Sequence, residues 1–142
     1  MLFRSRRLGV PVAAGAKQRF ADDRVSISAV IGDVAGRDVI VLDDEIAKGS
    51  TVLELIDRLR DAGARSIRVA CTHGLFAAGA LERIGAQPDV LEIVCTNTVP
   101  VPSSSEKLTV LSVAPALAQA VQRIHDGESV SALFDVVVPQ VG

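Results

Sequence analysis

Residues 39–51 read VIVLDDEIAKGST, and this stretch decides the fold. Its first four residues form a continuous aliphatic run, which is typical of a strand buried on both faces of a sheet. Two carboxylates, Asp43 and Asp44, follow the run, and a short loop leads into a segment whose apolar residues recur at i, i+3, i+4 and i+7 from Val52 to Leu59. The stretch therefore predicts a buried strand, a loop and an amphipathic helix in immediate succession.

The predicted helix has a signal at each end. Thr51 and, three residues later, Glu54 form a capping-box pattern, so we expect the Thr51 side chain to cap the helix. Gly63 follows the last apolar position and is placed to end the helix.

The rest of the chain alternates between strand-like and helix-like segments. Strands are predicted at residues 10–14, 26–31, 66–70, 90–95 and 108–112, and helices at residues 77–84 and from Pro115 to Gly127. Residues 17–24 lack apolar periodicity and are expected to form a mobile loop. This alternation indicates an α/β fold with a mostly parallel sheet flanked by helices. We expect residues 8–142 to form one domain, and residues 1–7 to be a non-native or truncated start.

Composition excludes several functions. The chain has 142 residues, 49% of them hydrophobic, and a formal net charge of -2, so no basic surplus drives non-specific binding to nucleic acid. With no Trp or Tyr and four Phe, it lacks aromatic platforms for stacking on single-stranded bases. No apolar run approaches the ~18 residues that span a bilayer. Cys71 and Cys95 sit in apolar strand-like runs and are expected to be buried thiols of a cytoplasmic protein.

The strand–loop–helix stretch contains the candidate ligand-binding residues. In an open α/β sheet, ligands bind beyond the carboxyl ends of the strands. The amides and dipole of a helix N-terminus favour a phosphate there, and Gly49 lets the backbone turn toward it. The Thr51 hydroxyl adds a donor, and Asp43 and Asp44 can accept hydrogen bonds from the vicinal hydroxyls of a sugar. The stretch thus predicts a site for a phosphorylated pentose; the alternative is that both acids are solvated loop residues and Thr51 only caps its helix.

Three further residues are given structural interpretations. Lys48 precedes Gly49, so the loop is not a Walker loop, which needs the lysine after the glycine. His73 is expected to be a hydrogen-bonded loop residue, and His125 lies near the end of a helix, where a cation suits the dipole.

Several motifs resemble those of one enzyme family. VIVLDDEIAKGST resembles the ribose 5-phosphate loop of type I phosphoribosyltransferase folds. LRDAGARSIRVACTHGLF, CTNTVP, LAQAVQRIHDGESVSALF and LGVPVAAGAKQRF are similar, in the same order, to segments of the ribose-phosphate pyrophosphokinases. The chain is identified as a member of that family from Leu8 to Phe134, as part of the C-terminal half. The resemblance implies a phosphoribosyltransferase-like, Rossmann-like three-layer fold.

The resemblance also implies an activity. The family transfers the diphosphoryl group of Mg-ATP to the C1 hydroxyl of ribose 5-phosphate, which gives phosphoribosyl pyrophosphate and AMP. By this resemblance Asp43 would hold the ribose, with Asp44 beside it. The residues expected around the 5-phosphate are Ala47, Lys48, Gly49, Ser50 and Thr51. Lys17 and Arg19 align with catalytic cations on a flexible loop, and Arg19 is also expected to contact ribose 5-phosphate.

The chain departs from the family in two ways. The family loop usually reads Asp-Thr-Gly-Gly-Thr, so Ala47 removes an acid, Lys48 adds a positive charge and Ser50 replaces a glycine. The family's enzymes are about twice as long, and their N-terminal half supplies most ATP contacts and a metal-binding histidine. We therefore expect no metal ligands in this chain, Mg²⁺ bound together with ATP, and no synthetase activity from the chain alone. Family members assemble as hexamers, which implies a homo-oligomer.

Two alternative functions remain open from the sequence. One is a phosphoribosyltransferase of the same fold that consumes phosphoribosyl pyrophosphate; the closing segment QRIHDGESVSALF and the Lys17–Arg19 pair count against it. The other is a non-catalytic paralogue that binds and regulates a synthetase, which Ala47 and Lys48 make conceivable.

Overall fold

The computed structural model describes residues 9–19, 25–102 and 104–134. By its internal contacts the chain divides into two compact units. The larger comprises residues 13–111 and holds the sheets and the predicted site, and the smaller comprises residues 1–12 and 112–142.

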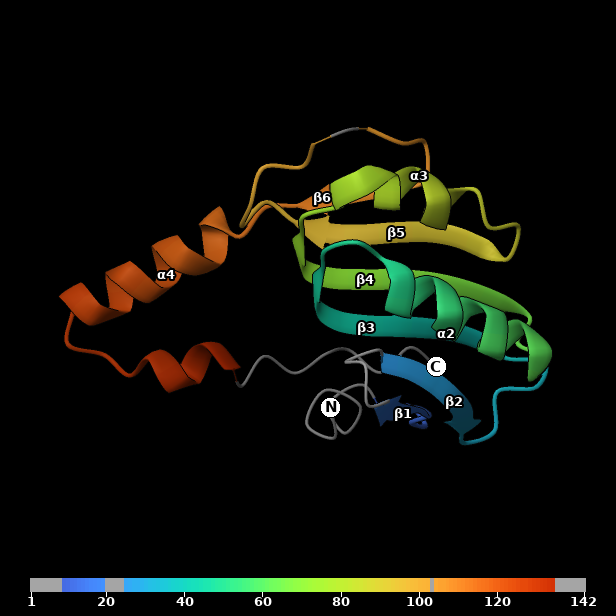
Figure 1. Cartoon of the computed structure of the whole chain (residues 1–142). Coiled ribbons are helices and arrows are strands. Elements are labelled where there is room, and N and C mark those ends of the chain that lie inside the picture. The colour runs from blue at the N-terminus through green and yellow to red at the C-terminus, as the bar shows by residue number, and fades with distance from the viewer. Residues whose placement is uncertain (1–8, 20–24, 103, 135–142) are drawn as a thin grey trace. The chain divides into compact units, whose positions relative to one another are not determined.

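A parallel sheet is the centre of the larger unit (Figure 1). Its strands are β3 (Asp38–Ile46), β4 (Ser66–Gly74), β5 (Val90–Thr96) and β6 (Leu108–Leu111), which lie side by side in chain order. All three neighbouring pairs are parallel. The helix α2 (Ser50–Asp61) connects β3 to β4, and the 3₁₀ turn η1 (Ala77–Gly79) and helix α3 (Ala80–Gly85) connect β4 to β5. The predicted α/β fold with a parallel sheet is thereby confirmed.

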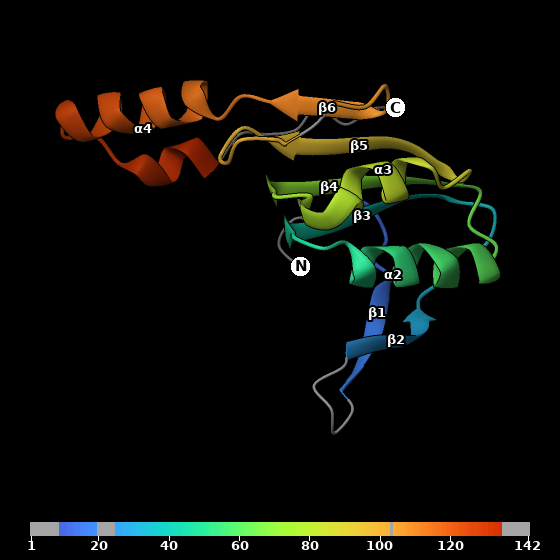
Figure 2. The same ribbon diagram turned by 45° about the horizontal axis from the view of Figure 1, so that its top comes forward.

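Helices α2 and α3 lie on the same face of this sheet, where they enclose the core (Figures 1 and 2). α2 buries Val52, Ile56 and Leu59, and α3 buries Leu81 and Ile84. The sheet residues in the same core include Val41, Ile67, Val69, Ile93 and the free thiols Cys71 and Cys95. Burial of each large aliphatic side chain favours folding by roughly 1.5–3 kcal/mol, so this layer dominates the stability of the unit.

The opposite face of the sheet is partly exposed. Ile40 in the middle of β3 is 65% exposed, although the aliphatic run at residues 39–42 predicted a strand buried on both faces. That prediction is wrong at Ile40, which alternates with the buried Val41 on a strand whose covered face is the one toward α2 and α3. Beside Ile40 in the register lies Arg68, whose Nε is 3.7 Å from Glu92 Oε2.

A hairpin precedes the parallel sheet. Strand β1 (Ala14–Arg19) pairs antiparallel with β2 (Val25–Ile31), and α2 contacts β2. The strand predicted at residues 26–31 is confirmed, but the strand predicted at residues 10–14 is wrong, because residues 10–13 are not in a strand. Lys17 and Arg19, expected in a loop, lie in β1, because an antiparallel ladder of backbone hydrogen bonds needs no apolar periodicity. The rest of the predicted loop, residues 20–24, lies outside the described residues.

The ends of α2 differ in how well they were predicted. The residue before the helix is Gly49, with φ 72°, and no side chain caps the N-terminus. The predicted Thr51 cap is therefore wrong: the helix begins at Ser50, which places Thr51 inside its first turn. The C-terminal prediction is confirmed, since Gly63 follows the helix with φ 79° and donates its N–H to Arg60 O at 2.9 Å.

The smaller unit contains helix α4 (Ala114–His125) and the 3₁₀ segment η2 (Val130–Phe134), which contact each other. Pro115 lies in the first turn of α4, and Gly127 follows the helix with φ 72°, as predicted. None of the helices in the described part of the chain is both long and apolar enough to cross a membrane.

Candidate functional site

The carboxyl end of β3 and the N-terminus of α2 line an open pocket of about 350 Å³. Asp43 and Asp44 lie within β3, so the strand continues past the acids, and the connection to α2 is the three residues Ala47–Gly49. We call these three residues the phosphate loop, after the role that the sequence predicts for them. The pocket is lined by Asp43, Glu45, Ile46, Ala47, Lys48, Gly49, Ser50, Thr51 and Val52.

The structure brings most of the predicted site together. Every residue predicted around the phosphate lines the pocket, and so does Asp43, whereas Asp44 does not. Sequence reasoning missed Glu45, Ile46 and Val52. A signal for Glu45 existed, because it is the third carboxylate in a row after the aliphatic run.

The α2 side of the pocket suits an anion. The first turn of α2 contains no acidic residue, so no negative side chain there competes with a bound anion for the positive end of the helix dipole. Gly49 adopts a left-handed conformation, and Lys48 is exposed at the pocket wall. The free amides of a helix N-terminus bind phosphate readily.

The β3 side of the pocket carries negative charge. Asp43 Oδ1 accepts the N–H of Asp44 at 3.0 Å, and Asp44 Oδ1 accepts the N–H of Glu45 at 3.0 Å. Asp44 lies next to these lining residues but outside the lining, and its pKa is held below its ordinary value, first by a hydrogen bond with the Asp43 side chain, then by backbone amides and finally by the charge of His73. Carboxylates that stay ionised near neutral pH are acceptors for hydroxyl groups.

His73 lies on the neighbouring strand at the same edge of the sheet. It belongs to β4, paired with Glu45, and its Nδ1 is 2.8 Å from Thr98 Oγ1. The expectation of a hydrogen-bonded histidine is confirmed, although the residue lies in a strand and not in a loop. Thr98 Oγ1 also donates to Thr72 O at 3.1 Å, so this side chain network ties β4 to the residues after β5.

Two hydrogen bonds connect the end of β3 and the phosphate loop to the residues that follow β4. The N–H of Phe76 donates to Ile46 O at 3.0 Å, and Arg83 Nη2 donates to Lys48 O at 2.6 Å. Neither contact was foreseen from the sequence, because each partner is far away along the chain.

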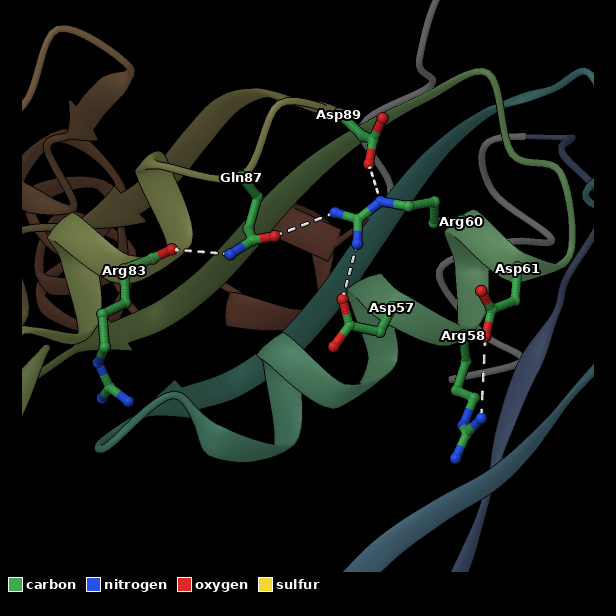
Figure 3. Close-up of polar contacts among 7 residues, drawn as sticks. All are labelled: Asp57, Arg58, Arg60, Asp61, Arg83, Gln87 and Asp89. Carbon is green, nitrogen blue, oxygen red and sulfur yellow. Dashed lines mark hydrogen bonds and ion pairs between the residues drawn. The ribbon is translucent and has the colours of Figure 1, made fainter.

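A polar network at the C-terminal end of α2 joins this helix to α3 (Figure 3). Arg60 forms an ion pair with Asp89, donates from Nη1 to Asp57 at 2.8 Å and from Nη2 to Gln87 Oε1 at 3.0 Å. Gln87 Nε2 in turn donates to the carbonyl of Arg83 at 3.3 Å. The two helices that carry and support the loop are thus fixed to each other.

The two cations predicted to be catalytic are described by their backbone alone. Lys17 pairs with Ile27, and Arg19 pairs with Val25 in the β1–β2 hairpin. Their side chains lie outside the described part of the structure, so their roles stay predictions.

The described residues do not fit a resident metal ion. Among the described residues, no group of three or more His, Cys, Asp and Glu side chains could hold one. Mg²⁺ demands near-octahedral oxygen coordination.

The parallel sheet, with a pocket between a strand end and a helix N-terminus, defines an open α/β protein, a class in which ligands bind beyond the carboxyl ends of the strands. A family model described as the phosphoribosyl synthetase-associated domain matches residues 7–135. The chain belongs to this family.

Individual relatives agree with that assignment. A Streptomyces coelicolor protein named "Putative ribose-phosphate pyrophosphokinase" is 79% identical over 133 residues, which are 92% of this chain and 42% of the relative. A ribose-phosphate pyrophosphokinase of Deinococcus radiodurans is 42% identical over 135 residues, again 42% of its length. The crystal structure of phosphoribosylpyrophosphate synthetase from Mycobacterium smegmatis superimposes with a TM-score of 0.72 at 35% identity and covers 84% of this chain and 38% of that one. The chain thus spans well under half the length of these relatives.

Proposed function

We propose that this chain binds ribose 5-phosphate and forms the ribose side of a ribose-phosphate diphosphokinase. The single observation that carries the proposal is the pocket between β3 and α2, in which an acidic wall faces a helix N-terminus that lacks acidic residues. The 5-phosphate binds at the phosphate loop and the first turn of α2, and Asp43 accepts hydrogen bonds from the ribose hydroxyls.

The proposed reaction transfers a diphosphoryl group from ATP to the C1 hydroxyl of the bound sugar. The C1 oxygen attacks the β-phosphorus of ATP, the bond between the α,β-bridging oxygen and the β-phosphorus breaks, the hydroxyl proton leaves, and AMP departs. Phosphoryl transfer depends on positioning and on neutralising charge on the non-bridging oxygens, a role that suits Lys17 and Arg19 of the hairpin. In this proposal Mg²⁺ enters bound to the phosphate oxygens of ATP, which are the ligands it prefers.

The whole activity is proposed to need more than this chain. The curated relatives are more than twice as long as the portion that aligns. We expect the chain alone to release no AMP from ATP and ribose 5-phosphate in a coupled assay; robust turnover would contradict this. Assembly into a homo-oligomer is part of the same proposal and can be checked by light scattering.

Calorimetric titration with ribose 5-phosphate tests the binding proposal, with ribose as the control ligand. We expect saturable heat from ribose 5-phosphate and much weaker binding of ribose, because the phosphate supplies most of the affinity. Equal binding of both ligands, or binding of neither up to millimolar concentration, would contradict the proposal.

A second experiment tests the departures in the loop. Replacing Ala47 by Asp and Lys48 by Thr restores the usual family residues at two pocket positions. If the natural loop is competent, the double variant changes affinity for ribose 5-phosphate by only a few-fold. If instead the chain is a non-catalytic paralogue, the natural chain fails to bind and the double variant gains binding.

A further inference from the structure

We propose that Arg83 is a positioning residue for the phosphate loop: by holding the Lys48 carbonyl, it turns the Gly49 amide toward the phosphate of the bound sugar. This inference rests on the proposed function, because it concerns how the same loop is kept ready for ribose 5-phosphate.

The contact itself is short and charge-assisted. Arg83 lies in α3, and its Nη2 donates to Lys48 O at 2.6 Å while its Nε donates to Gly79 O at 3.4 Å. A hydrogen bond from a charged donor is stronger than a neutral one. The guanidinium therefore fixes the loop carbonyl against a helix that is itself anchored in the core through Leu81 and Ile84.

Because a peptide bond is planar, this contact also sets the direction in which the loop amide points. The described residues contain no cis peptide bonds, and in a planar trans peptide the C=O and the next N–H point in opposite directions. Lys48 O points toward Arg83, so the Gly49 N–H points away from α3. The peptide two residues earlier is held in the same way, because Ile46 O accepts the Phe76 N–H at 3.0 Å and so turns the Ala47 N–H outward. The Ala47 and Gly49 amides, on either side of Lys48, can then both donate to an anion on the open side of the loop.

The segment that holds the loop is strained. Phe76 and Ala78 adopt positive φ values of 46° and 54°, which are uncommon for residues with a Cβ. Such conformations persist where the surroundings enforce them, and they cluster at functional sites. Here the strained turn lies between the Phe76 contact with Ile46 and the Arg83 contact with Lys48.

Arg83 can be truncated without disturbing the core, since the residue is exposed. Its backbone carbonyl, which accepts Gln87 Nε2, is kept in every variant. The side chain is therefore a feasible target for a test of positioning.

The experiment measures ribose 5-phosphate affinity by calorimetry in the full chain and in the variants Arg83→Ala and Arg83→Lys. We expect Arg83→Ala to weaken binding by about 10- to 100-fold, as the loss of a charged hydrogen bond can do, and to lower the melting temperature by only a few degrees. Arg83→Lys keeps a charged donor that can reach the carbonyl and should recover most of the loss. The control is Arg37→Ala, which removes an equal charge at the turn before β3 and should bind as the natural chain does. Unchanged affinity in Arg83→Ala, or no recovery by lysine, would overturn the inference.

Amide hydrogen exchange separates this inference from the proposed function. The Leu53 N–H donates to Gly49 O at 2.9 Å and so reports on the loop without any ligand. Arg83→Ala should speed exchange at Leu53 about tenfold and leave Val94 in β5 unchanged, because only the loop end of α2 loosens. If the natural chain binds no ribose 5-phosphate, the proposed function fails, and the exchange rate at Leu53 alone decides whether Arg83 holds the loop. Unchanged exchange would overturn that role as well.

Discussion

Gly49 and Ala80 lie so close together that a Cβ on Gly49 would be 3.1 Å from the Cβ of Ala80. The same Cβ would be 3.2 Å from Ile84 Cδ1, and Gly49 has φ 72°. Gly49 of the phosphate loop therefore packs directly on α3: its backbone conformation favours glycine, and a Cβ there would press on Ala80 and Ile84.

Gly49→Ala should destabilise the protein by about 2–5 kcal/mol. The left-handed conformation costs a residue with a Cβ about 1–2 kcal/mol, and overpacking against α3 adds about 1–3 kcal/mol. Urea denaturation measures the change as a lower unfolding midpoint, and the variant should also bind ribose 5-phosphate more weakly.

Gly36→Ala is the matched control for this substitution. Gly36 has a similar φ of 67°, but a Cβ there would meet nothing within 4 Å. Gly36→Ala should therefore lower the free energy of unfolding only by the conformational cost of about 1–2 kcal/mol. Equal losses at the two glycines would show that the contact with α3 adds nothing.

Arg60→Ala should lower the free energy of unfolding by about 1 kcal/mol, because it removes two contacts that join α2 to the residues after α3 and one contact within α2. The side chain is partly exposed, so the effect should shrink in 1 M salt, where surface charges are screened. Chemical denaturation at low and high salt measures both effects.

Arg58→Ala serves as the comparison on the same helix. Arg58 Nη1 lies 3.8 Å from Asp61 Oδ2, and both residues belong to α2 (Figure 3). Loss of this exposed ion pair should cost less than about 0.5 kcal/mol. A larger loss in Arg58→Ala than in Arg60→Ala would contradict a linking role for Arg60.

Stability should fall at high pH because of Cys71. Burial, assisted by the neighbouring Cys95, raises the pKa of the Cys71 thiol from 9.0 to about 11. The folded state thus holds the proton more tightly, so this contribution is complete below pH 9 and is lost as the pH rises toward 11. Ionisation of the Cys71 thiol should lower the free energy of unfolding by about 2 kcal/mol in total. Denaturation between pH 8 and 11 should show a shallower decline in Cys71→Ala than in the natural chain; identical slopes would contradict the prediction.

Much of the sheet could be predicted from the sequence, because local patterns specify it. The aliphatic runs at β3, β4 and β5 and the stop at Gly63 depend on neighbours in the chain, and each lies where it was expected. The hairpin β1–β2 was missed in part, because its pairing places Lys17 opposite Ile27 without an apolar pattern in β1. The exposure of Ile40 could not be read from its aliphatic neighbours, since it depends on which face the helices cover.

Most residues that line the pocket could be predicted from the sequence, but the contacts that hold the phosphate loop in place could not. The residues from Asp43 to Thr51 are consecutive, so a strand–loop–helix pattern was enough to bring them together. Arg83 lies 35 residues from Lys48, and no spacing rule predicts that a helix side chain binds a loop carbonyl at this separation. Thr51 was misplaced as a cap because the positive φ of Gly49 starts the helix earlier.

A nuclear magnetic resonance titration with ribose 5-phosphate tests most directly whether the phosphate loop binds the sugar phosphate. We predict saturable shifts at the backbone amides of Ala47, Gly49, Ser50 and Thr51, and no comparable shifts at these amides with ribose. If those four amides do not move with ribose 5-phosphate up to millimolar concentration, or if ribose moves them equally, the pocket between β3 and α2 is not a sugar-phosphate site.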